Sequence, residues 1–406
     1  WKAEVSVAIL AQAFGSSYRT IASALGVRHA KGCGRLSVIH DFLRLAFRAR
    51  PMGEIALRRR ASVLLLLLRK LLGGRRLRTL LLSAISFRAW MHRRWCKGLL
   101  ETVASALFCF RFLPYRRELV STPQGREYCV WWPPSSPRKG RRCWVLLPGG
   151  MSSGRDFYIT SLGTSAAIAE DESWAVFHNP GQGGSRCQPE AQGLSRTDCL
   201  ANFLERIRDQ FDHIVVVGFS AGGMPALKMA QEESPIADAF VGVCSPDRIR
   251  LVFEEQSRWL CRLDVFFSIW FYFCARAAGL TKFVPFKKFP WPPTWHGYMK
   301  PFTEKTFEVS TGESRTFEQL ERQHFDGSVV RPATVPCLRI LCSDDPIVPS
   351  KTLEHERLKH CEVWWEPRGG HCGQFFCAPD LAQRLREWVL KGEQEQGKAA
   401  SAALLK

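Results

Sequence analysis

The sequence predicts an α/β protein with a mostly parallel sheet and helices on both of its faces, and two features carry this prediction. From about residue 116 onward, short runs rich in Val, Ile, Phe and Trp alternate with longer amphipathic runs. Strands that alternate with helices form parallel sheets. The second feature is the turn Gly218-Phe-Ser-Ala-Gly222, which joins an apolar run directly to a helical one. Such sharp strand-to-helix turns occur at the carboxyl edge of these sheets.

Each element follows from its local sequence. Residues 118–122 and 127–132 flank a Pro123-Gln-Gly125 turn and predict an antiparallel hairpin. The remaining predicted strands are residues 143–147, 174–178, 213–217, 239–244, 337–342 and 361–365. The predicted helices are residues 156–169, 200–211 and 379–391, and the polar, Ala-rich tail of residues 392–406 is expected to fray.

The basic charge of the chain belongs to its N-terminal segment, residues 1–115. Residues 1–120 hold 23 basic and 5 acidic side chains, a net charge of +18, whereas the net charge of residues 121–406 is +1. Residues 62–82 are long enough to span a bilayer but contain five Arg and Lys. Each such charge costs about 2.5–3.5 kcal/mol at the bilayer centre, which argues against a spanning helix.

Three interpretations of the basic segment remain. Residues 1–110 form a membrane-surface helix, or an organelle transit segment, or a poorly ordered stretch. No recognised nucleic-acid-binding module accompanies the charge, so nucleic acid is not an expected partner.

The 15 cysteines include no CxxC pair and no Cys/His cluster with zinc spacing. Most lie in apolar runs such as Val241-Gly-Val-Cys244, where a small buried thiol is expected. Reduced thiols favour a reducing compartment over a disulfide framework. We therefore expect a membrane-associated protein in a reducing compartment, with organelle targeting as the alternative.

The strand-to-helix turn predicts Ser220 as a catalytic nucleophile. A serine on so tight a turn adopts a strained backbone, and the flanking glycines let neighbouring chain approach without Cβ clashes. The helix that follows directs its free amides and positive dipole end to the same place. A bare G-x-S-x-G is a weak signal, but one between a strand and a helix is specific.

A serine nucleophile needs a base, and the base needs an acid that orients it. Asp345 follows the strand 337–342, and His371 lies in the glycine-rich loop after the strand 361–365. Asp344 is the competing acid and Asp247 a second reserve. Taken singly, each of these residues also suits an ordinary loop or turn. Their order Ser, Asp, His at three strand ends favours a triad.

Acyl transfer also needs donors for the developing oxyanion. The amide of Ala221, the residue after the nucleophile, is the first candidate. The loop after Leu147 supplies the second, with Gly150 the preferred donor and Met151 in reserve. A plain turn at these glycines is the simpler alternative.

Residues 118–391 resemble the α/β-hydrolase superfamily. The motifs that carry the resemblance are Leu147-Pro-Gly-Gly-Met-Ser-Ser-Gly154, Gly218-Phe-Ser-Ala-Gly-Gly-Met224, Cys342-Ser-Asp-Asp-Pro346 and Gly369-Gly-His-Cys-Gly373. They are similar to the branch of abhydrolase-domain proteins one to three and their bacterial and plant relatives. That resemblance implies Ser220, Asp345 and His371 as the triad, esterase or lipase activity on acyl lipids, and membrane attachment through an N-terminal segment. The chain departs from the branch at Asn179-Pro-Gly181, where the branch has Asn-x-Arg-Gly, and in its highly charged N-terminal segment.

The long stretch between the strands 239–244 and 337–342 predicts an inserted helical cap at about residues 247–335 within the domain 116–391. It contains the aromatic run Val265–Cys274 and further aromatics up to Trp295. These side chains either pack the cap on the sheet, or form an apolar roof for an acyl chain or a lipid-facing lip, with Lys287 and Lys288 beside it for anionic head groups.

The sequence therefore predicts a serine hydrolase of carboxylic esters, with acyl lipids as favoured substrates. Ser220 attacks the ester carbonyl, His371 takes its proton, Asp345 holds the imidazole, and water releases the acyl-enzyme. No metal or organic cofactor is implied. The alternatives are an acyltransferase on the same triad and a non-catalytic lipid-binding or scaffold protein.

Overall fold

The computed structural model describes one α/β unit in the C-terminal part of the chain. The chain divides into residues 1–93 and residues 94–406, and all described residues belong to the second unit. The described residues are 113–134, 139–150, 152–166, 171–185, 196–257, 268, 272, 294–327, 329–378 and 380–404. The membrane-surface and targeting hypotheses for residues 1–110 therefore lie outside the described residues, as do Lys287, Lys288 and most of the run 265–274.

The unit is built on an eight-stranded, mostly parallel sheet, as predicted. In spatial order the strands are β1 (Arg116–Ser121), β2 (Glu127–Trp132), β4 (Glu172–His178), β3 (Gly140–Leu147), β5 (Phe211–Phe219), β6 (Ala239–Val243), β7 (Cys337–Cys342) and β8 (Glu362–Glu366). Only β2 runs against the others, because it pairs antiparallel with both β1 and β4. The pairs from β4 to β8 are all parallel. Their carboxyl ends therefore meet at one edge of the sheet.

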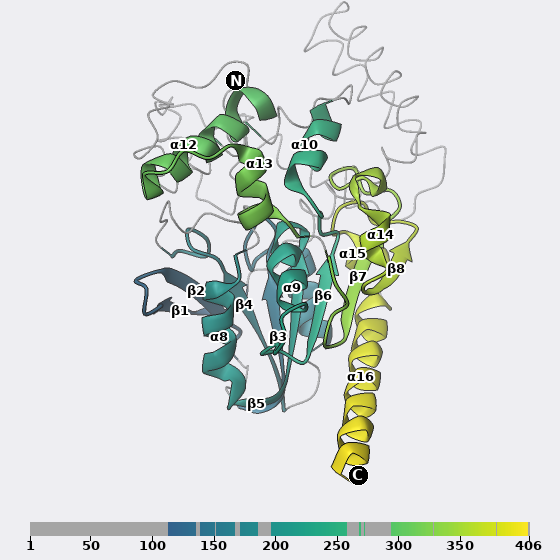
Figure 1. Ribbon diagram of the computed structural model, residues 1–406. Helices are drawn as coiled ribbons and strands as arrows, with labels where there is room; N and C mark the ends of the chain where they lie inside the picture. The colour runs from purple at the N-terminus through teal and green to yellow at the C-terminus, as the bar shows by residue number, and fades with distance from the viewer. Residues whose placement is uncertain are drawn as a thin grey trace, which may run out of the picture. The chain divides into compact units, whose positions relative to one another are not determined.

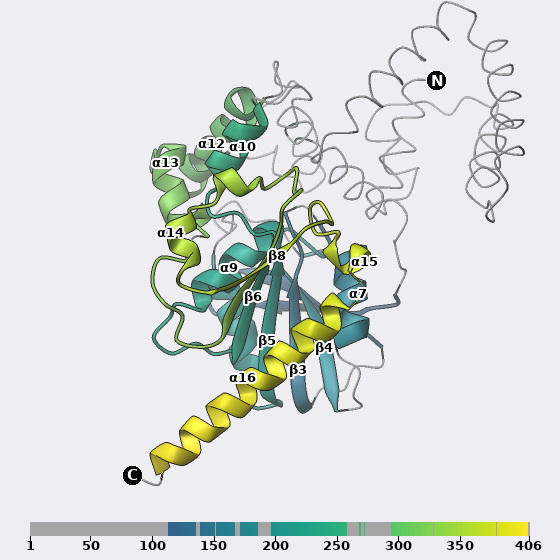
Figure 2. The same ribbon diagram turned by 90° about the vertical axis from the view of Figure 1, so that its right-hand side faces the viewer.

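Two hydrophobic cores hold helices on the two faces of the sheet. Alternate residues of β3 point to opposite faces, so Val145 belongs to one core and Leu146 to the other. The first face is covered by α8 (Asp198–Arg208) and α9 (Gly223–Met229). The second is covered by α7 (Phe157–Ala166), α15 (Gln374–Cys377) and the start of α16 (Leu381–Leu404). Figures 1 and 2 show the two sets on opposite sides of the strands.

The expectation of a frayed tail at residues 392–406 is wrong, since α16 continues to Leu404. Gln, Glu, Lys and Ala, which dominate this stretch, are good helix formers. Glu393 also anchors the helix to the sheet, because Arg142 on β3 donates to its two carboxylate oxygens at 2.8 and 2.7 Å. The same guanidinium pairs with the buried Glu172 of β4. The helix therefore continues beyond the residues that its apolar pattern predicted, and this ion-pair network supports the extension.

Between β6 and β7 the structure describes a group of helices that falls within the predicted insertion of residues 247–335. They are α10 (Ile249–Ser257), the π-helical turns η4 (Trp295–Met299) and η5 (Glu321–Phe325), α12 (Lys300–Thr311) and α13 (Phe317–Leu320). Both ribbon views place α10, α12 and α13 beyond the sheet edge at which α9 begins (Figures 1 and 2). None of the described helices is both long enough and apolar enough to cross a membrane.

A buried ion pair ties this insertion to the sheet. Asp247, just after β6, accepts from Nη1 of Arg339 on β7 at 2.6 Å and from the amide of Glu354 at 2.7 Å. Both charged side chains are fully buried, and Nη2 of Arg339 donates to the carbonyl of Ser245 at 2.8 Å. Removing one member of such a pair leaves the other charge buried without compensation.

Asp247→Ala should therefore lower the free energy of unfolding by about 3–5 kcal/mol. The partly exposed pair of Arg250 and Glu254 on α10 provides the control, and Glu254→Ala should cost less than about 1 kcal/mol. Urea unfolding followed by tryptophan fluorescence measures both. Equal, small losses in the two variants would contradict this account.

Candidate active site

The candidate nucleophile Ser220 sits on a strained turn at the carboxyl end of β5. Its φ of 50° lies in the left-handed region, which non-glycine residues rarely adopt. The 3₁₀ turn Ser220–Gly222 (η2) leads directly into α9. A Cβ on Gly218 would collide with the carbonyl of Gly222, and a Cβ on Gly222 would lie 2.5 Å from the carbonyl oxygen of Leu147. The turn can form only because both flanking positions lack a side chain.

The loop after β3 lies against this turn. A Cβ on Gly149 would lie 3.1 Å from the Cβ of Ser220, and one on Gly150 would lie 3.5 Å from the Cβ of Ala221. The loop predicted to supply an oxyanion donor is thus adjacent to the predicted nucleophile. Met151, the reserve donor, lies outside the described residues.

A network of buried polar groups holds this loop, and it was not anticipated from the sequence. The Gly149 amide lies 3.4 Å from the hydroxyl of Tyr158, which lies 3.3 Å from the carboxylate of Asp156. The Asp156 carboxylate also accepts from the amide of Ser153 at 2.9 Å. Burial raises the pKa of Asp156 to about 6 despite these hydrogen bonds. Since Gly149 is engaged with Tyr158, Gly150 remains the better-placed donor of the loop.

A buried histidine fixes the far end of the same loop. The amide of Gly154 donates to Nε2 of His178 on β4 at 3.1 Å. Burial lowers the pKa of His178 to about 3, so its imidazole is neutral and can accept this hydrogen bond. His178 thus supports the loop after β3.

The structure brings Asp345 and His371 together. Nδ1 of His371 lies 2.9 Å from Oδ2 and 3.2 Å from Oδ1 of Asp345. Oδ1 of Asp345 also accepts from the amides of Ile347 and Val348 at 2.8 and 2.9 Å. The carboxylate is buried and the imidazole side chain is 10% exposed. A carboxylate so oriented fixes the tautomer of the histidine and stabilises its cation.

The competing acids have other contacts. Oδ1 of Asp344 accepts from the amide of Gly370 and from the thiol of Cys342, each at 2.9 Å. It therefore anchors the loop that carries His371. The reserve acid Asp247 is engaged by Arg339 and by the amide of Glu354. Its place directly after β6 resembled that of a catalytic acid, but the buried cation on β7 holds it.

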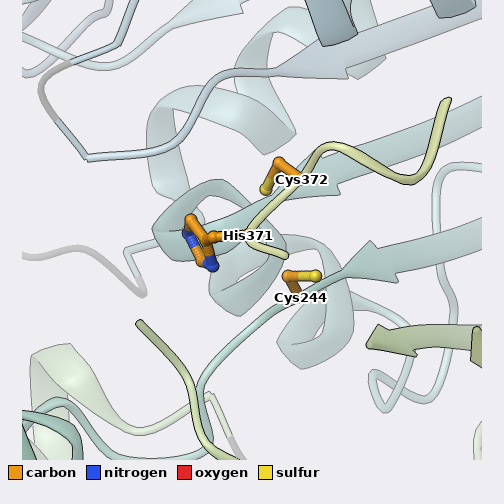
Figure 3. Close-up of side chains that lie close together, drawn as sticks. All are labelled: Cys244, His371 and Cys372. Atoms are coloured by element: carbon orange, nitrogen blue, oxygen red, sulfur yellow. The ribbon is translucent and has the colours of Figure 1, made fainter. Parts of the chain in front are cut away.

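Two cysteines flank the histidine (Figure 3). Cys244 follows β6, Cys372 follows His371, and their sulfurs and one ring nitrogen of His371 all lie within 4.8 Å of one another. Both thiols are buried. Among the described residues this is the one cluster of His, Cys, Asp and Glu donors compact enough to suggest a metal, and its donor types suit a soft ion such as Zn²⁺.

The groups of this cluster and the nearby Asp345 shift the pKa values of His371 and the two cysteines. Burial lowers the pKa of His371, but the Asp345 carboxylate and the Cys372 thiolate outweigh burial and raise it well above its usual value. Burial raises the pKa of Cys372, but a hydrogen bond from Cys244 and the positive charge of His371 lower it to about 6. Burial together with the neighbouring Cys372 keeps the pKa of Cys244 well above its usual value. The shifts have opposite directions, so negative charge is favoured on Cys372 over Cys244.

The helices between β6 and β7 pack an apolar wall beside the serine. Ala221, directly after Ser220, and Met224 of α9 belong to one buried cluster with aromatic side chains of the insertion, namely Tyr272, Trp295, Tyr298, Phe302 and Phe317. Trp295 stacks on Phe253 of α10 at 4.6 Å between ring centroids and meets Phe317 edge-on at 4.7 Å. The aromatic residues of the insertion thus reach the residue next to the candidate nucleophile.

Comparison with known families agrees with this geometry. The family model described as the alpha/beta hydrolase family matches residues 144–383, more than half of the chain. The chain belongs to the alpha/beta hydrolase family. The matched region of the hydrolase begins on β3 and ends in α16, so it includes Ser220, Asp345, His371 and the insertion. This membership confirms the superfamily and the predicted fold class.

Several solved structures are similar to the hydrolase at low identity. An esterase from Pyrococcus furiosus is 16% identical with a TM-score of 0.46, and the match covers 69% of this chain and 92% of that one. A putative aryl esterase from Burkholderia cenocepacia is 15% identical with a TM-score of 0.42, covering 69% and 100%. Est1E from Butyrivibrio proteoclasticus, solved with ferulic acid, is 15% identical with a TM-score of 0.44, covering 68% and 99%.

Two cysteines of the site were not among the predicted site residues, although both lie in positions where candidate residues were expected. Cys244 ends a predicted strand at the edge where Asp345 was sought, and Cys372 adjoins His371. The apolar run around Cys244 indicated burial, which is correct, but gave no sign of its neighbour. No sequence signal marks Asp156, Tyr158 or His178 as supports of the loop after β3.

Gly222→Ala tests the packing of the turn against this loop. Its new methyl group would press on the carbonyls of Leu147 and Pro148, so we expect a loss of about 1–3 kcal/mol in the free energy of unfolding. Gly150→Ala is the matched control, because a Cβ there makes an ordinary contact of 3.5 Å and should change stability by less than about 0.5 kcal/mol. Chemical denaturation compares the two, and a neutral Gly222→Ala would refute this packing.

Proposed function

We propose that the hydrolase cleaves carboxylic esters, with acyl lipids as its substrates, through Ser220, His371 and Asp345. The observation that carries the proposal is the hydrogen bond from His371 to the buried Asp345 at the sheet edge where Ser220 occupies its strained turn. An oriented imidazole and a strained serine at one edge are the parts that acyl transfer requires.

In the proposed mechanism Oγ of Ser220 attacks the ester carbonyl while His371 accepts its proton. Asp345 holds the imidazole through Nδ1 and stabilises the cation that forms. The amides of Ala221 and Gly150 donate to the oxyanion; removing one such donor costs about 2.7–4 kcal/mol in comparable enzymes. His371 then returns the proton to the leaving alcohol. Water, activated by the same base, releases the acyl group and regenerates Ser220.

The apolar wall supports the proposed lipid substrate. Ala221 would donate to the oxyanion through its backbone, while its methyl group lies in the aromatic cluster with Trp295 and Tyr298. An acyl chain on the carbonyl that Ser220 attacks would therefore extend beside aromatic side chains. Burying each CH₂ of such a chain is worth about 0.8 kcal/mol, which favours longer acyl esters over acetate.

Labelling with a fluorophosphonate probe tests the nucleophile. The wild-type protein should label, and Ser220→Ala should not, since the probe forms its bond with an activated serine. Ser257→Ala, at the end of α10 in the insertion, is the control and should label like the wild type.

The substrate class is tested next on unlabelled protein from the same preparation. A series of p-nitrophenyl esters from acetyl to decanoyl, then monoacylglycerols and phospholipids, should show kcat/KM rising with chain length. Failure of the folded wild type to label would remove the hydrolase proposal and leave a lipid-binding role for the cap. Product analysis with added alcohols separates hydrolysis from acyl transfer.

The charge of Cys372 predicts a pH effect. A general base acts as the neutral imidazole, so the labelling rate should rise with pH as His371 loses its proton. Because the Cys372 thiolate helps to raise the pKa of His371, Cys372→Ser should lower that pKa and move the rise to lower pH. The measurement is the second-order labelling rate constant against pH. Cys143→Ser, a buried thiol of β3, should leave the profile in place; a wild-type profile in Cys372→Ser would contradict the assignment.

A further inference from the structure

The two thiols beside His371 have a geometry that the proposed reaction does not require. The sulfurs of Cys244 and Cys372 lie within 4.8 Å of each other and of a ring nitrogen of His371. Their backbones are left-handed, with φ of 48° and 62°. Together with Ser220 they are the non-glycine residues with positive φ in the described part of the chain. Such strain costs about 1–3 kcal/mol per residue and gathers at functional sites.

The two sulfurs differ in the way that thiol oxidation requires. The sulfur of Cys372 lies within 4.8 Å of a ring nitrogen of His371, whose positive charge lowers the pKa of this thiol, and the thiolate is the form that attacks a peroxide. Cys244 is the neighbouring thiol that can resolve the product. Nε2 of Gln374 donates to the Cys244 sulfur at 2.6 Å and would stabilise negative charge there when its proton leaves.

We propose that Cys244 and Cys372 form an oxidisable dithiol, a modification site for hydroperoxides, whose disulfide switches off the hydrolase. The chemical site stands on the proximity of the two sulfurs alone. The loss of activity rests on the proposed function, because it acts through His371.

The reaction is balanced with one hydroperoxide. The Cys372 thiolate attacks the peroxide, an S–O bond forms, the O–O bond breaks, and the leaving oxygen takes a proton to become water or an alcohol. The sulfur of Cys244 then attacks the sulfenic acid, the S–S bond forms, and the hydroxyl group leaves as water with the thiol proton. Two thiols are oxidised and one hydroperoxide is reduced. An external dithiol reverses the reaction.

The disulfide would move the histidine. A disulfide needs about 2.05 Å between the sulfurs, closer than two hydrogen-bonded thiols approach, so the loop carrying Cys372 must shift toward β6. His371 precedes Cys372 directly and would lose its alignment with Asp345. A misplacement of about 1 Å can cost about 100-fold in rate. Loss of the Cys372 charge would also lower the pKa of His371 and favour the free base, but this gain is smaller than the loss of alignment.

A bound metal is the competing use of the same atoms. Zinc would need a ring nitrogen at about 2.0–2.1 Å and both sulfurs at about 2.3 Å. The disulfide needs only the two sulfurs, which lie within 4.8 Å of each other, and does not need the ring nitrogen. The geometry therefore favours the dithiol, and zinc becomes an outcome of the test.

The test treats the full-length reduced protein with hydrogen peroxide in the presence of a chelator and follows two readouts. Peptide mass spectrometry should show Cys244 joined to Cys372, and fluorophosphonate labelling should fall at least tenfold and return with dithiothreitol. In Cys244→Ser, basal labelling should persist, no disulfide should form at this site, and dimedone should trap a sulfenic acid on Cys372. In Cys372→Ser neither adduct should appear.

A second thiol pair is the matched control. Cys337, the first residue of β7, and Cys361, just before β8, also lie close enough for each thiol to shift the pKa of the other, but at the amino ends of their strands. Oxidation of that pair should leave labelling unchanged, and the double variant Cys337→Ser/Cys361→Ser should keep the peroxide response.

Three results would overturn the inference. The first is that no Cys244–Cys372 disulfide forms at peroxide levels that oxidise Cys337 and Cys361. The second is that the disulfide is mapped but labelling does not fall. The third is that added Zn²⁺ inhibits and a chelator reverses this inhibition, while peroxide has no effect. Failure of the proposed function would look different. The reduced protein would then never label at Ser220, while peptide mapping would still decide whether the dithiol forms.

Discussion

The candidate site depends on a steric constraint at the end of β5. Gly218 and Gly222 are each in contact with backbone where any side chain would collide, and Ser220 between them has a left-handed backbone. This close packing brings the turn against the loop after β3 and starts α9 directly behind the serine. The candidate oxyanion donors, Ala221 and Gly150, are neighbours for the same reason. The parallel sheet alone brings the strand ends to one edge. The close packing of this turn is what also places the candidate nucleophile beside the candidate oxyanion donors.

Around this turn the polar groups are held by contacts of different kinds. Two backbone amides and His371 engage Asp345, while Asp344 next to it anchors the amide of Gly370. Adjacent carboxylates thus have separate tasks, one on the imidazole and one on its loop. The loop after β3 is held through Tyr158 and His178. Each of these supports is buried, so its hydrogen bonds act in a low dielectric and define one geometry.

The same compactness accounts for the cysteine pair. Cys244 directly follows β6, which lies between β5 and β7 in the sheet, so its side chain falls between the elements that carry Ser220 and Asp345. His371 reaches across that position from the loop after β8 to meet Asp345. Any residue at the end of β6 would therefore lie close to the histidine. This residue is a cysteine, and a second cysteine directly follows His371, so the position is chemically reactive.

The sequence by itself determined the sheet, the order of its strands along the chain, and the candidates Ser220, Asp345 and His371. These depend on local signals: apolar runs, glycines that permit a tight turn, and residues placed after strands. The sequence favoured Asp345 but left Asp344 and Asp247 as alternatives, because all three follow strands and only spatial neighbours separate them. It also missed the helix beyond Lys391, which an ion pair between Glu393 and Arg142 supports, and the meeting of Cys244 with Cys372. Contacts between residues more than a hundred positions apart follow from packing across the sheet, which no local pattern encodes.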